Sequence, residues 1–514
     1  MKNTILPLAL IMSLFFLMTA VIADPDTEEY FIEDWSYPPN DFINLVYCAD
    51  LENDGIWEVF AGSSDGIVYN LGKKGKQTDH KNWEINVGGD VKALKIVDFD
   101  GDSKKEILVA ADKIDGLRIL DYQGLDKGST IELNTKPYDL DIVDIDDDGT
   151  NEVVIGGANK KIYILKRDIK EDKFVWEYTT KGPVHYVCAT DLNGDGDEEI
   201  IAMSKWRDVD DNKAGIYVLN KKGELKWSYE IKGGIFTSGK AVDVVDLDND
   251  NKKEIVIGTY KHGVDVLDCD GKLKWNYPTE RLVNVIYTSD LDLDGDVSIL
   301  IGARPYLYVV DGDGRLEWKS PVNTTIHSIH AVDLDKDNNP DVLIGATRHI
   351  HILDNNGNRM GIWNYKLEIR GLTKAFELKE VDVNSIYSAD IDNDLENEVI
   401  VGFGWVDDRM DKTYKLGDIR VFKVNKNYRS PTPPVSTTLK ETETTIIPDV
   451  VSTTMRKETT STTKEMENES EKEGESKDKG PCCIPFLTGI LGLAFSITLG
   501  IPYLLISKKR ENDG

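Results

Sequence analysis

Acidic and amide side chains alternate through the stretch DLNGDGDEE at residues 191–199, which also contains two glycines. Oxygen atoms at alternate positions of a tight turn can surround one hard divalent cation, and calcium takes carboxylate, amide and carbonyl oxygens together with water. The stretch therefore predicts a calcium loop. Side chains at positions 1, 3, 5 and 9 and the backbone carbonyl of position 7 would bind the ion.

The same nine-residue pattern recurs along the chain and defines eight units, whose first residues are 43 to 57 positions apart. Carboxylates this close repel one another without a cation between them, although solvated acidic turns remain an alternative interpretation. The predicted ligands of several structural Ca²⁺ sites are Asp50, Glu52, Asp54 and Glu58 in unit 1; Asp98, Asp100, Asp102 and Glu106 in unit 2; Asp144, Asp146, Asp148 and Glu152 in unit 3; Asp191, Asn193, Asp195 and Glu199 in unit 4; Asp246, Asp248, Asp250 and Glu254 in unit 5; Asp290, Asp292 and Asp294 in unit 6; Asp333, Asp335, Asp337 and Asp341 in unit 7; and Asp390, Asp392, Asp394 and Glu398 in unit 8.

Three units depart from this pattern. Unit 6 has Ser298 at the ninth position, and unit 7 has Pro340 directly before its ninth-position acid. Unit 8 has Leu395 at the sixth position, where glycine or asparagine would accept a left-handed turn. The sequence therefore predicts calcium more firmly for units 1 to 5 than for units 6, 7 and 8.

An EF-hand is a different calcium site, with a twelve-residue loop closed by a bidentate glutamate. The twelfth position is apolar in all eight units, as Ala61, Val109, Ile155, Met203, Ile257, Ile301, Ile344 and Val401. The pattern therefore favours loops between strands over EF-hands.

Four short stretches with the period of a β-strand make up each unit, such as VKALKIV, EIVIGT, GIYVLN and LKWSYEI, with the acidic loop after the first. Four short strands joined by tight turns and repeated at this spacing are typical of a β-propeller blade. Six units have a tryptophan in the fourth stretch, which we interpret as packing between blades, at Trp83, Trp176, Trp227, Trp275, Trp318 and Trp363.

The last unit lacks a fourth strand, but YFIEDWSYPP at residues 30–39 resembles one. A ring closed by this N-terminal strand would leave no free sheet edge to aggregate. The predicted fold class is therefore all-β, an eight-bladed propeller of four-stranded blades over residues 24–428, followed by a disordered stalk and one transmembrane helix.

The pattern D-x-[DN]-x-D-G-x-x-[DE] between strands resembles FG-GAP and VCBS-type repeats, as in the head of integrin α chains, over about residues 28–428. The resemblance implies that the metal loops join first and second strands on one face of the disc. It also implies that partners bind the opposite face, where the loops from second to third strand lie.

The segments that flank the predicted propeller indicate that it lies outside the cell. Residues 1–23 read as a signal peptide, residues 429–483 as a Thr/Ser/Glu-rich stalk, 484–506 as a membrane-spanning helix and 507–514 as a cytoplasmic tail. We expect a cell-surface, single-pass membrane protein. The sequence leaves open whether the C-terminal helix is retained or removed by processing. Asn323 and Asn468 begin predicted glycosylation sequons. A net charge of −31 argues against nucleic acid as a partner.

Two of the predicted loops from second to third strand are long, SKWRDVDDNKAG in unit 4 and GFGWVDDRMDKTYKLGD in unit 8. Units 4 and 8 of an eight-membered ring face each other across the channel. Aromatic and basic side chains suit stacking on a sugar or docking a protein loop. The predicted partner-binding residues are Trp206, Arg207, His262, Arg304, Arg348 and Trp405.

The sequence favours a cell-surface recognition or adhesion protein that binds a protein or glycan, and no enzymatic activity is expected. An envelope or assembly scaffold is the main alternative. The stretches DGKLKW and KGELKW also resemble quinoprotein dehydrogenase repeats, and calcium-containing polysaccharide lyases are a further alternative. No serine or cysteine nucleophile motif is present.

Overall fold

The computed structural model describes residues 30–39, 41–51, 53, 55, 57–72, 83–113, 116–125, 131–167, 172–208, 211–235, 241–365, 381–407 and 414–426. All of them lie in one compact unit, Met1–Glu443. The predicted signal peptide, stalk, membrane helix and tail, together with Glu52, Asp54 and Asn468, lie outside the described residues. Within those residues, no helix has the length and apolar character needed to cross a membrane.

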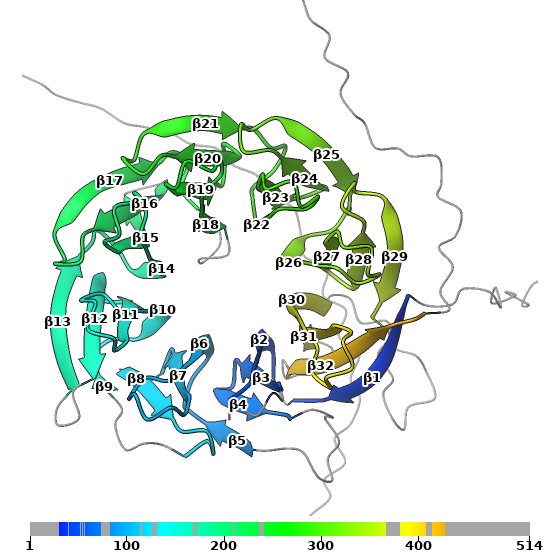
Figure 1. The fold of residues 1–514 in the computed structure, drawn as a ribbon, viewed down its shortest axis with the longest axis horizontal. Helices are drawn as coiled ribbons and strands as arrows, with labels where there is room; N and C mark the ends of the chain where they lie inside the picture. The colour runs from blue at the N-terminus through cyan, green and yellow to red at the C-terminus, as the bar shows by residue number, and fades with distance from the viewer. Residues whose placement is uncertain are drawn as a thin grey trace, which may run out of the picture. The chain divides into compact units, whose positions relative to one another are not determined.

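Eight four-stranded antiparallel sheets form a closed ring, which confirms the predicted eight-bladed propeller (Figure 1). In the first half of the ring, blade 1 contains β2 (Ile43–Ala49), β3 (Glu58–Ser63), β4 (Ile67–Asn70) and β5 (Trp83–Asn86); blade 2 contains β6 (Val91–Val97), β7 (Glu106–Ala111), β8 (Gly116–Leu120) and β9 (Ile131–Glu132); blade 3 contains β10 (Pro137–Val143), β11 (Glu152–Gly157), β12 (Lys161–Arg167) and β13 (Asp172–Thr179); and blade 4 contains β14 (Val184–Thr190), β15 (Glu199–Asp208), β16 (Asp211–Leu219) and β17 (Leu225–Ile231).

The second half repeats the same order from the channel outward. Blade 5 contains β18 (Val242–Val245), β19 (Glu254–Gly258), β20 (Val264–Leu267) and β21 (Leu273–Tyr277); blade 6 contains β22 (Val285–Ser289), β23 (Ser298–Ala303), β24 (Tyr306–Val310) and β25 (Leu316–Pro321); blade 7 contains β26 (Ile326–Val332), β27 (Asp341–Ala346), β28 (His349–Leu353) and β29 (Arg359–Asn364); and blade 8 contains β30 (Val381–Ala389), β31 (Glu398–Asp407), β32 (Tyr414–Val424) and the N-terminal strand β1 (Phe31–Tyr37).

Strand β1 closes the ring, as the sequence predicted. It pairs antiparallel with β32, from Phe31 opposite Val424 to Tyr37 opposite Ile419. Blades 8 and 1 also approach each other closely where the ring closes. A Cβ added to Gly402 of β31 would lie 2.5 Å from Cγ2 of Ile43 in β2. Only glycine allows the first strand of blade 1 to approach blade 8 this closely.

The hydrophobic core lies between blades. Buried apolar side chains of the described residues form eight clusters, and each cluster is shared by two neighbouring blades. The second strand of every blade is buried along its described length, except at residues 205–207 of β15, because it packs against a blade on either side, as the apolar stretch EVVIGG of β11 illustrates. Burial on both faces explains why these strands have continuous apolar sequences.

Fourth-strand tryptophans join neighbouring blades, which confirms the interpretation from the sequence. The indole Nε1 of Trp275 in blade 5 donates to the carbonyl oxygen of Gly312 in blade 6 at 2.9 Å. Its ring covers Gly314, where an added Cβ would lie 2.8 Å from the indole and where φ is +80°. Both the left-handed backbone and the indole contact require glycine at that turn.

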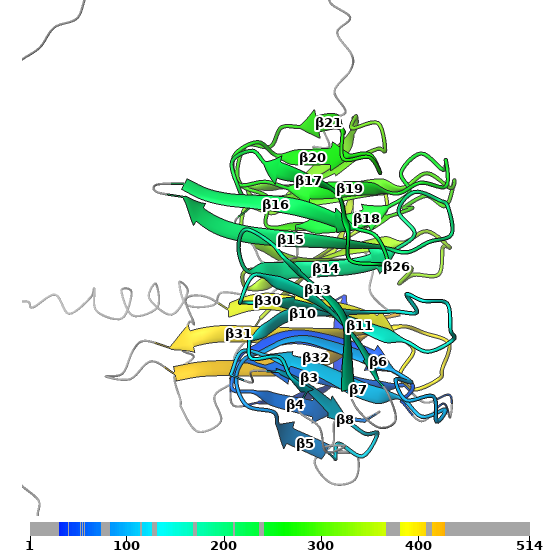
Figure 2. The same cartoon turned by 90° about the vertical axis from the view of Figure 1, so that its left-hand side faces the viewer.

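The two long connections in blades 4 and 8 are hairpins, not loops as the sequence predicted. Strands β15 and β16 pair from Ile200 opposite Leu219 to Asp208 opposite Asp211, and β31 and β32 extend in the same way to Asp407 opposite Tyr414. Figure 2 shows both hairpins projecting beyond the disc on one side. Backbone pairing continues through the polar stretches because each strand supplies the ladder partners of the other.

Candidate metal centres and binding face

The eight acidic loops share one backbone feature in their described residues. In every loop, the residue at position 4 and the residue at position 6 have positive φ, including Asp147, Lys336, Leu293 and Leu395. The first aspartate stabilises this turn, because its Oδ2 accepts a hydrogen bond of 2.8–3.1 Å from the backbone N–H of position 6 in each blade. The loops of blades 6, 7 and 8 therefore keep this geometry despite their sequence departures.

The ninth-position acid is buried and has a fixed orientation in seven blades. One oxygen of Glu152 accepts a hydrogen bond from the backbone N–H of Ile145 at 3.0 Å, and the equivalent bond occurs in blades 1, 2, 4, 5, 7 and 8. In blades 3, 4, 5 and 8 the second oxygen, Oε1, lies 2.7–3.3 Å from a lysine ammonium group. Blade 6 differs because Ser298 takes this position.

Several predicted ligand sets do come together. Carboxylate oxygens lie within 4.8 Å of one another in the groups Asp98, Asp100 and Glu106; Asp144, Asp146 and Glu152; Asp246, Asp248 and Asp250; Asp290, Asp292 and Asp294; and Asp333, Asp335 and Asp341. These repeated groups could hold metal ions. The hard oxygen donors suit calcium, and Oδ1 of Asp246 and of Asp290 is buried without a hydrogen-bond partner, as expected of oxygens that a cation would contact.

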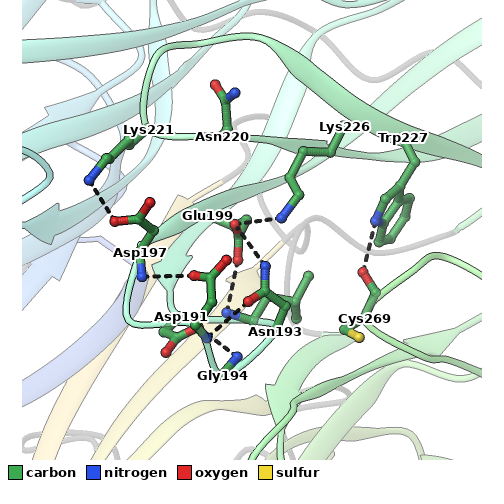
Figure 3. Close-up of polar contacts among 12 residues, drawn as sticks. Asp191, Asn193, Gly194, Asp197, Glu199, Asn220, Lys221, Lys226, Trp227 and Cys269 are labelled. Atoms are coloured by element: carbon green, nitrogen blue, oxygen red, sulfur yellow. Dashed lines mark hydrogen bonds and ion pairs between the residues drawn. The ribbon is translucent and has the colours of Figure 1, made fainter.

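Lysines that the sequence interpretation missed enter four of the loops. Figure 3 shows Lys226 of β17 reaching the blade 4 loop, where its Nζ lies 2.7 Å from Oε1 of Glu199. In blade 5, Lys274 of β21 lies 2.7 Å from Asp248 and 2.9 Å from Glu254. Both residues directly precede a fourth-strand tryptophan, in the sequence LKW that unit 4 and unit 5 share.

Blades 3 and 8 receive a lysine from the third strand instead. Lys166 of β12 contacts Asp146 and Asp148 and lies 3.3 Å from Glu152, its cross-strand neighbour. Burial alone would lower the pKa of Lys166, but hydrogen bonds to the acids give a net rise. Lys423 of β32 makes the corresponding contacts in blade 8. A calcium ion would have to displace or share these ammonium groups.

Blades 6 and 7 have no lysine at either position. The fourth-strand position before the tryptophan is Glu317 in blade 6, and the bulge position of β29 in blade 7 is Met360. In blade 7, burial and the charges of neighbouring aspartates raise the pKa of Asp341 to about 7. Among the described residues, no lysine ammonium pairs with the carboxylates of these two loops, since Lys336 of the blade 7 loop pairs instead with Glu396 of blade 8 at 3.2 Å.

Replacement of Leu395 tests the strain in the blade 8 loop. Leu395 has a φ of 68° and is 81% exposed, so its side chain contributes little packing. A left-handed conformation costs a leucine roughly 1–2 kcal/mol, and asparagine tolerates it better. We expect Leu395→Asn to raise the unfolding free energy by about 1 kcal/mol in urea denaturation.

A suitable control for that variant is Leu125→Asn, because Leu125 is 60% exposed and its φ is not positive. It should give no stabilisation. If both variants had the same effect, removal of exposed apolar surface and not backbone strain would explain the result.

The predicted partner-binding residues lie at the ends of second and third strands. Trp206 and Arg207 line a cavity of about 500 Å³ together with Lys213 and Tyr260. Trp206 is half-buried, and Nζ of Lys181 lies 5.2 Å from its ring centroid. This part of the predicted face is therefore assembled around the base of the β15–β16 hairpin.

Other predicted partner-binding residues are spread around the ring. His262, Arg304 and Arg348 occupy the turns between second and third strands in blades 5, 6 and 7, and His262 and Arg304 are exposed. The backbone of Trp405 belongs to β31, opposite Leu416, while its side chain lies outside the described part of the structure. Asn323 is exposed in the connection between β25 and β26.

Comparisons with known proteins agree with this architecture. Residues 191–257, from the blade 4 loop to β19, match the FG-GAP-like repeat. A comparison with curated protein sequences found no match. Among solved structures, Sqt1 of Saccharomyces cerevisiae is similar, with 11% identity and a TM-score of 0.54 over 77% of this chain and 98% of that chain.

Two further structures are similar to this chain. Sqt1 of Chaetomium thermophilum, solved with the N-terminus of the ribosomal protein L10, has 11% identity and a TM-score of 0.53 over 76% of this chain and 100% of that chain. The V. cholerae biofilm matrix protein Bap1 has 16% identity but a TM-score of 0.37, over 76% and 78% of the two chains, and does not bear on the assignment. Similarity at these identities concerns the fold alone. The chain is thus an eight-bladed β-propeller that contains an FG-GAP-like repeat.

Proposed function

We propose that this propeller is a cell-surface recognition module that binds a protein or glycan partner through the face bearing the two long hairpins. The observation that carries the proposal is the projection of β15–β16 and β31–β32 from one side of the disc, out of blades on opposite sides of the ring (Figures 1 and 2). Residues 429–483 would hold the propeller away from the membrane and residues 484–506 would anchor it. The proposal assigns the protein no catalytic step.

The cavity at the β15–β16 hairpin has the chemistry expected of a recognition site. Trp206 and Tyr260 offer aromatic surface, and Tyr260 is 44% exposed. Lys205 is half-buried, and burial lowers its pKa, so contact with an acidic group of a partner would be favourable there. Aromatic and arginine side chains commonly dominate binding energies at such sites.

Binding of the purified full-length protein to envelopes of the cells that produce it tests this proposal. We expect saturable binding in calcium buffer and at least roughly tenfold weaker binding for Trp206→Ala, because truncation of an anchoring tryptophan commonly costs about 2 kcal/mol or more. Trp57→Ala is a matched control, since Trp57 is 40% exposed but lies in the acidic loop of blade 1, on the other face.

Treatment of the envelopes separates the two partner classes. Loss of binding after protease digestion would identify a protein partner, and loss after periodate oxidation would identify a glycan. Absence of saturable binding by the unmodified protein would contradict the recognition role and favour the scaffold alternative. Equal binding by Trp206→Ala and the unmodified protein would place the site elsewhere.

A further inference from the structure

Lysine ammonium groups occupy the space between the metal-ligand positions in three loops. In blade 3, Nζ of Lys166 lies 2.8 Å from Asp146 and also contacts Asp148 and Glu152. In blade 8, Nζ of Lys423 lies 2.6 to 3.0 Å from three carboxylates, those of Asp392, Asp394 and Glu398. These acids stand at positions 3, 5 and 9 of their loops.

In blade 5 an ammonium group has the same location, but the lysine belongs to a different strand. Lys274 belongs to β21, the fourth strand, whereas the lysines of blades 3 and 8 belong to the third strand. Its Nζ lies between position 3 and position 9, at 2.7 Å from Asp248 and 2.9 Å from Glu254. The common feature of the three blades is therefore the location of the positive charge and not the location of the lysine in the sequence.

An ammonium group at this location competes with a divalent ion. Calcium would need the same carboxylate oxygens at 2.3–2.6 Å, which brings the two positive charges close together in a partly buried turn. Each lysine also offers its loop the neutralisation that would otherwise require a metal ion. The lysine-bearing loops of blades 3, 5 and 8 therefore fit a bound metal poorly.

Blade 6 has the opposite arrangement. Its loop borders a cavity of about 590 Å³ that is lined by Asp292, Asp294, Ser298 and Glu317. Glu317 stands at the β25 position that Lys274 has in β21, and its Oε1 accepts a hydrogen bond from Oγ of Ser298 at 2.9 Å. Among the described residues, no basic side chain forms an ion pair with the aspartates of this loop or with Glu317.

The two differences in blade 6 compensate each other. Ser298 removes a carboxylate from the second strand, and Glu317 supplies one from the fourth strand, directed at the same residue. Blade 6 therefore keeps the number of carboxylates found in blade 5 but lacks the ammonium group. Oδ1 of Asp290 in blade 6 and Oδ1 of Asp246 in blade 5 are both buried without a hydrogen-bond partner, so the ammonium group of Lys274 is what distinguishes the two loops.

We propose that lysines serve as the resident cations of the loops in blades 3, 5 and 8, and that divalent metal binds instead in the loops of blades 6 and 7, whose described carboxylates pair with no lysine, with Glu317 as the replacement ligand in blade 6. This distribution departs from the expectation from the sequence, which favoured units 1 to 5 over units 6, 7 and 8. It does not depend on the proposed recognition role.

Substitution of Lys274 in the full-length protein tests the first half of the proposal. Lys274→Met removes the charge and keeps a long unbranched side chain, as Met360 does in blade 7. We expect equilibrium dialysis with radioactive calcium to show one additional bound ion per chain. The thermal midpoint should fall in EDTA and rise more on calcium addition than it does for the unmodified protein.

Lys272→Met is the matched control, because Lys272 lies two residues away and pairs with Asp270 outside the loop. It should leave calcium stoichiometry unchanged. An unchanged stoichiometry for Lys274→Met would overturn the assignment of the lysine as the resident cation.

Two variants of blade 6 test the second half. Glu317→Gln should lose one bound calcium ion, whereas Glu177→Gln, which alters an exposed fourth-strand glutamate of blade 3, should lose none. The double variant Ser298→Glu, Glu317→Lys recreates the blade 5 residues in blade 6. It should also lose one ion, but its thermal midpoint in EDTA should rise.

The double variant should bind one calcium ion fewer and yet unfold at a higher temperature in EDTA. A variant that merely folded poorly would lose the ion and unfold at a lower temperature. Retention of all bound calcium by Glu317→Gln would overturn the role of Glu317. Retention by the folded double variant would show that a lysine in the loop does not exclude the metal.

Discussion

Removal of calcium with excess EDTA is expected to lower the thermal midpoint of the protein by on the order of 5–10 °C. At about 1 mM calcium and a dissociation constant near 10⁻⁴ M, each occupied loop stabilises the folded state by roughly 1.4 kcal/mol. About four occupied loops among those outside blades 3, 5 and 8 would contribute roughly 5–6 kcal/mol, which is comparable with the stability of a whole domain. Differential scanning calorimetry in matched buffers measures the shift.

Calcium-saturated EDTA is the control for that experiment, and it should leave the midpoint unchanged. Excess calcium added after chelation should restore the original midpoint. An identical midpoint in EDTA and in calcium would show that metal stabilises none of the eight loops.

Truncation of Trp318 is expected to be the most destabilising single substitution considered for this ring. Trp318 is 6% exposed, its Nε1 donates to the carbonyl oxygen of Asn355 at 3.0 Å, and its ring covers Gly357 in blade 7. Removal of a buried tryptophan side chain costs about 3–5 kcal/mol through lost packing and the cavity left behind. Urea denaturation of Trp318→Ala should show a loss of this size.

Trp318→Phe separates the contributions to that loss, because it keeps an aromatic ring and removes the hydrogen bond, whose net value is about 1 kcal/mol. It should therefore cost less than the alanine variant. A loss below about 1 kcal/mol for Trp318→Ala would contradict the role of this tryptophan as a link between blades 6 and 7.

The proposed distribution of lysine and metal among the loops determines how the stability of the propeller depends on calcium concentration. The three cysteines in the described residues, Cys48, Cys188 and Cys269, are free, so disulfides do not link these blades. Internal lysines would keep blades 3, 5 and 8 neutralised at low calcium. Under the proposal, calcium depletion would loosen mainly the loops outside blades 3, 5 and 8 and leave the rest of the ring folded.

Local pattern and repetition were sufficient to predict the architecture. Eight acidic loops at a regular spacing, each followed by short apolar stretches, indicated four-stranded blades because strand periodicity and tight turns are local properties. The absence of a fourth strand from unit 8 and the YFIEDWSYPP stretch together predicted closure by β1, which the register of Phe31 opposite Val424 confirms. The acids at positions 1, 3, 5 and 9 were also identified from spacing alone.

The environment of those acids depended on the tertiary structure. Lys166 is the cross-strand partner of Glu152, whereas Lys274 reaches its loop from a bulge in the fourth strand. Such contacts follow from strand register and bulge position, which the spacing of residues along the chain does not fix. Ser298 was recognised in the sequence only as a departure from the repeat, and its partner Glu317, at 2.9 Å, was identified only from the fold.

The binding face shows the same division between sequence and structure. Composition identified Trp206 and Arg207 as candidates, but backbone pairing made their segment a hairpin and placed both at a cavity with Lys213 and Tyr260. The sequence by itself therefore determined the repeat, the number of blades and the positions of the acidic loops, since these are encoded locally. Only the tertiary structure decided which charges meet in each loop, because side chains from separate strands converge there.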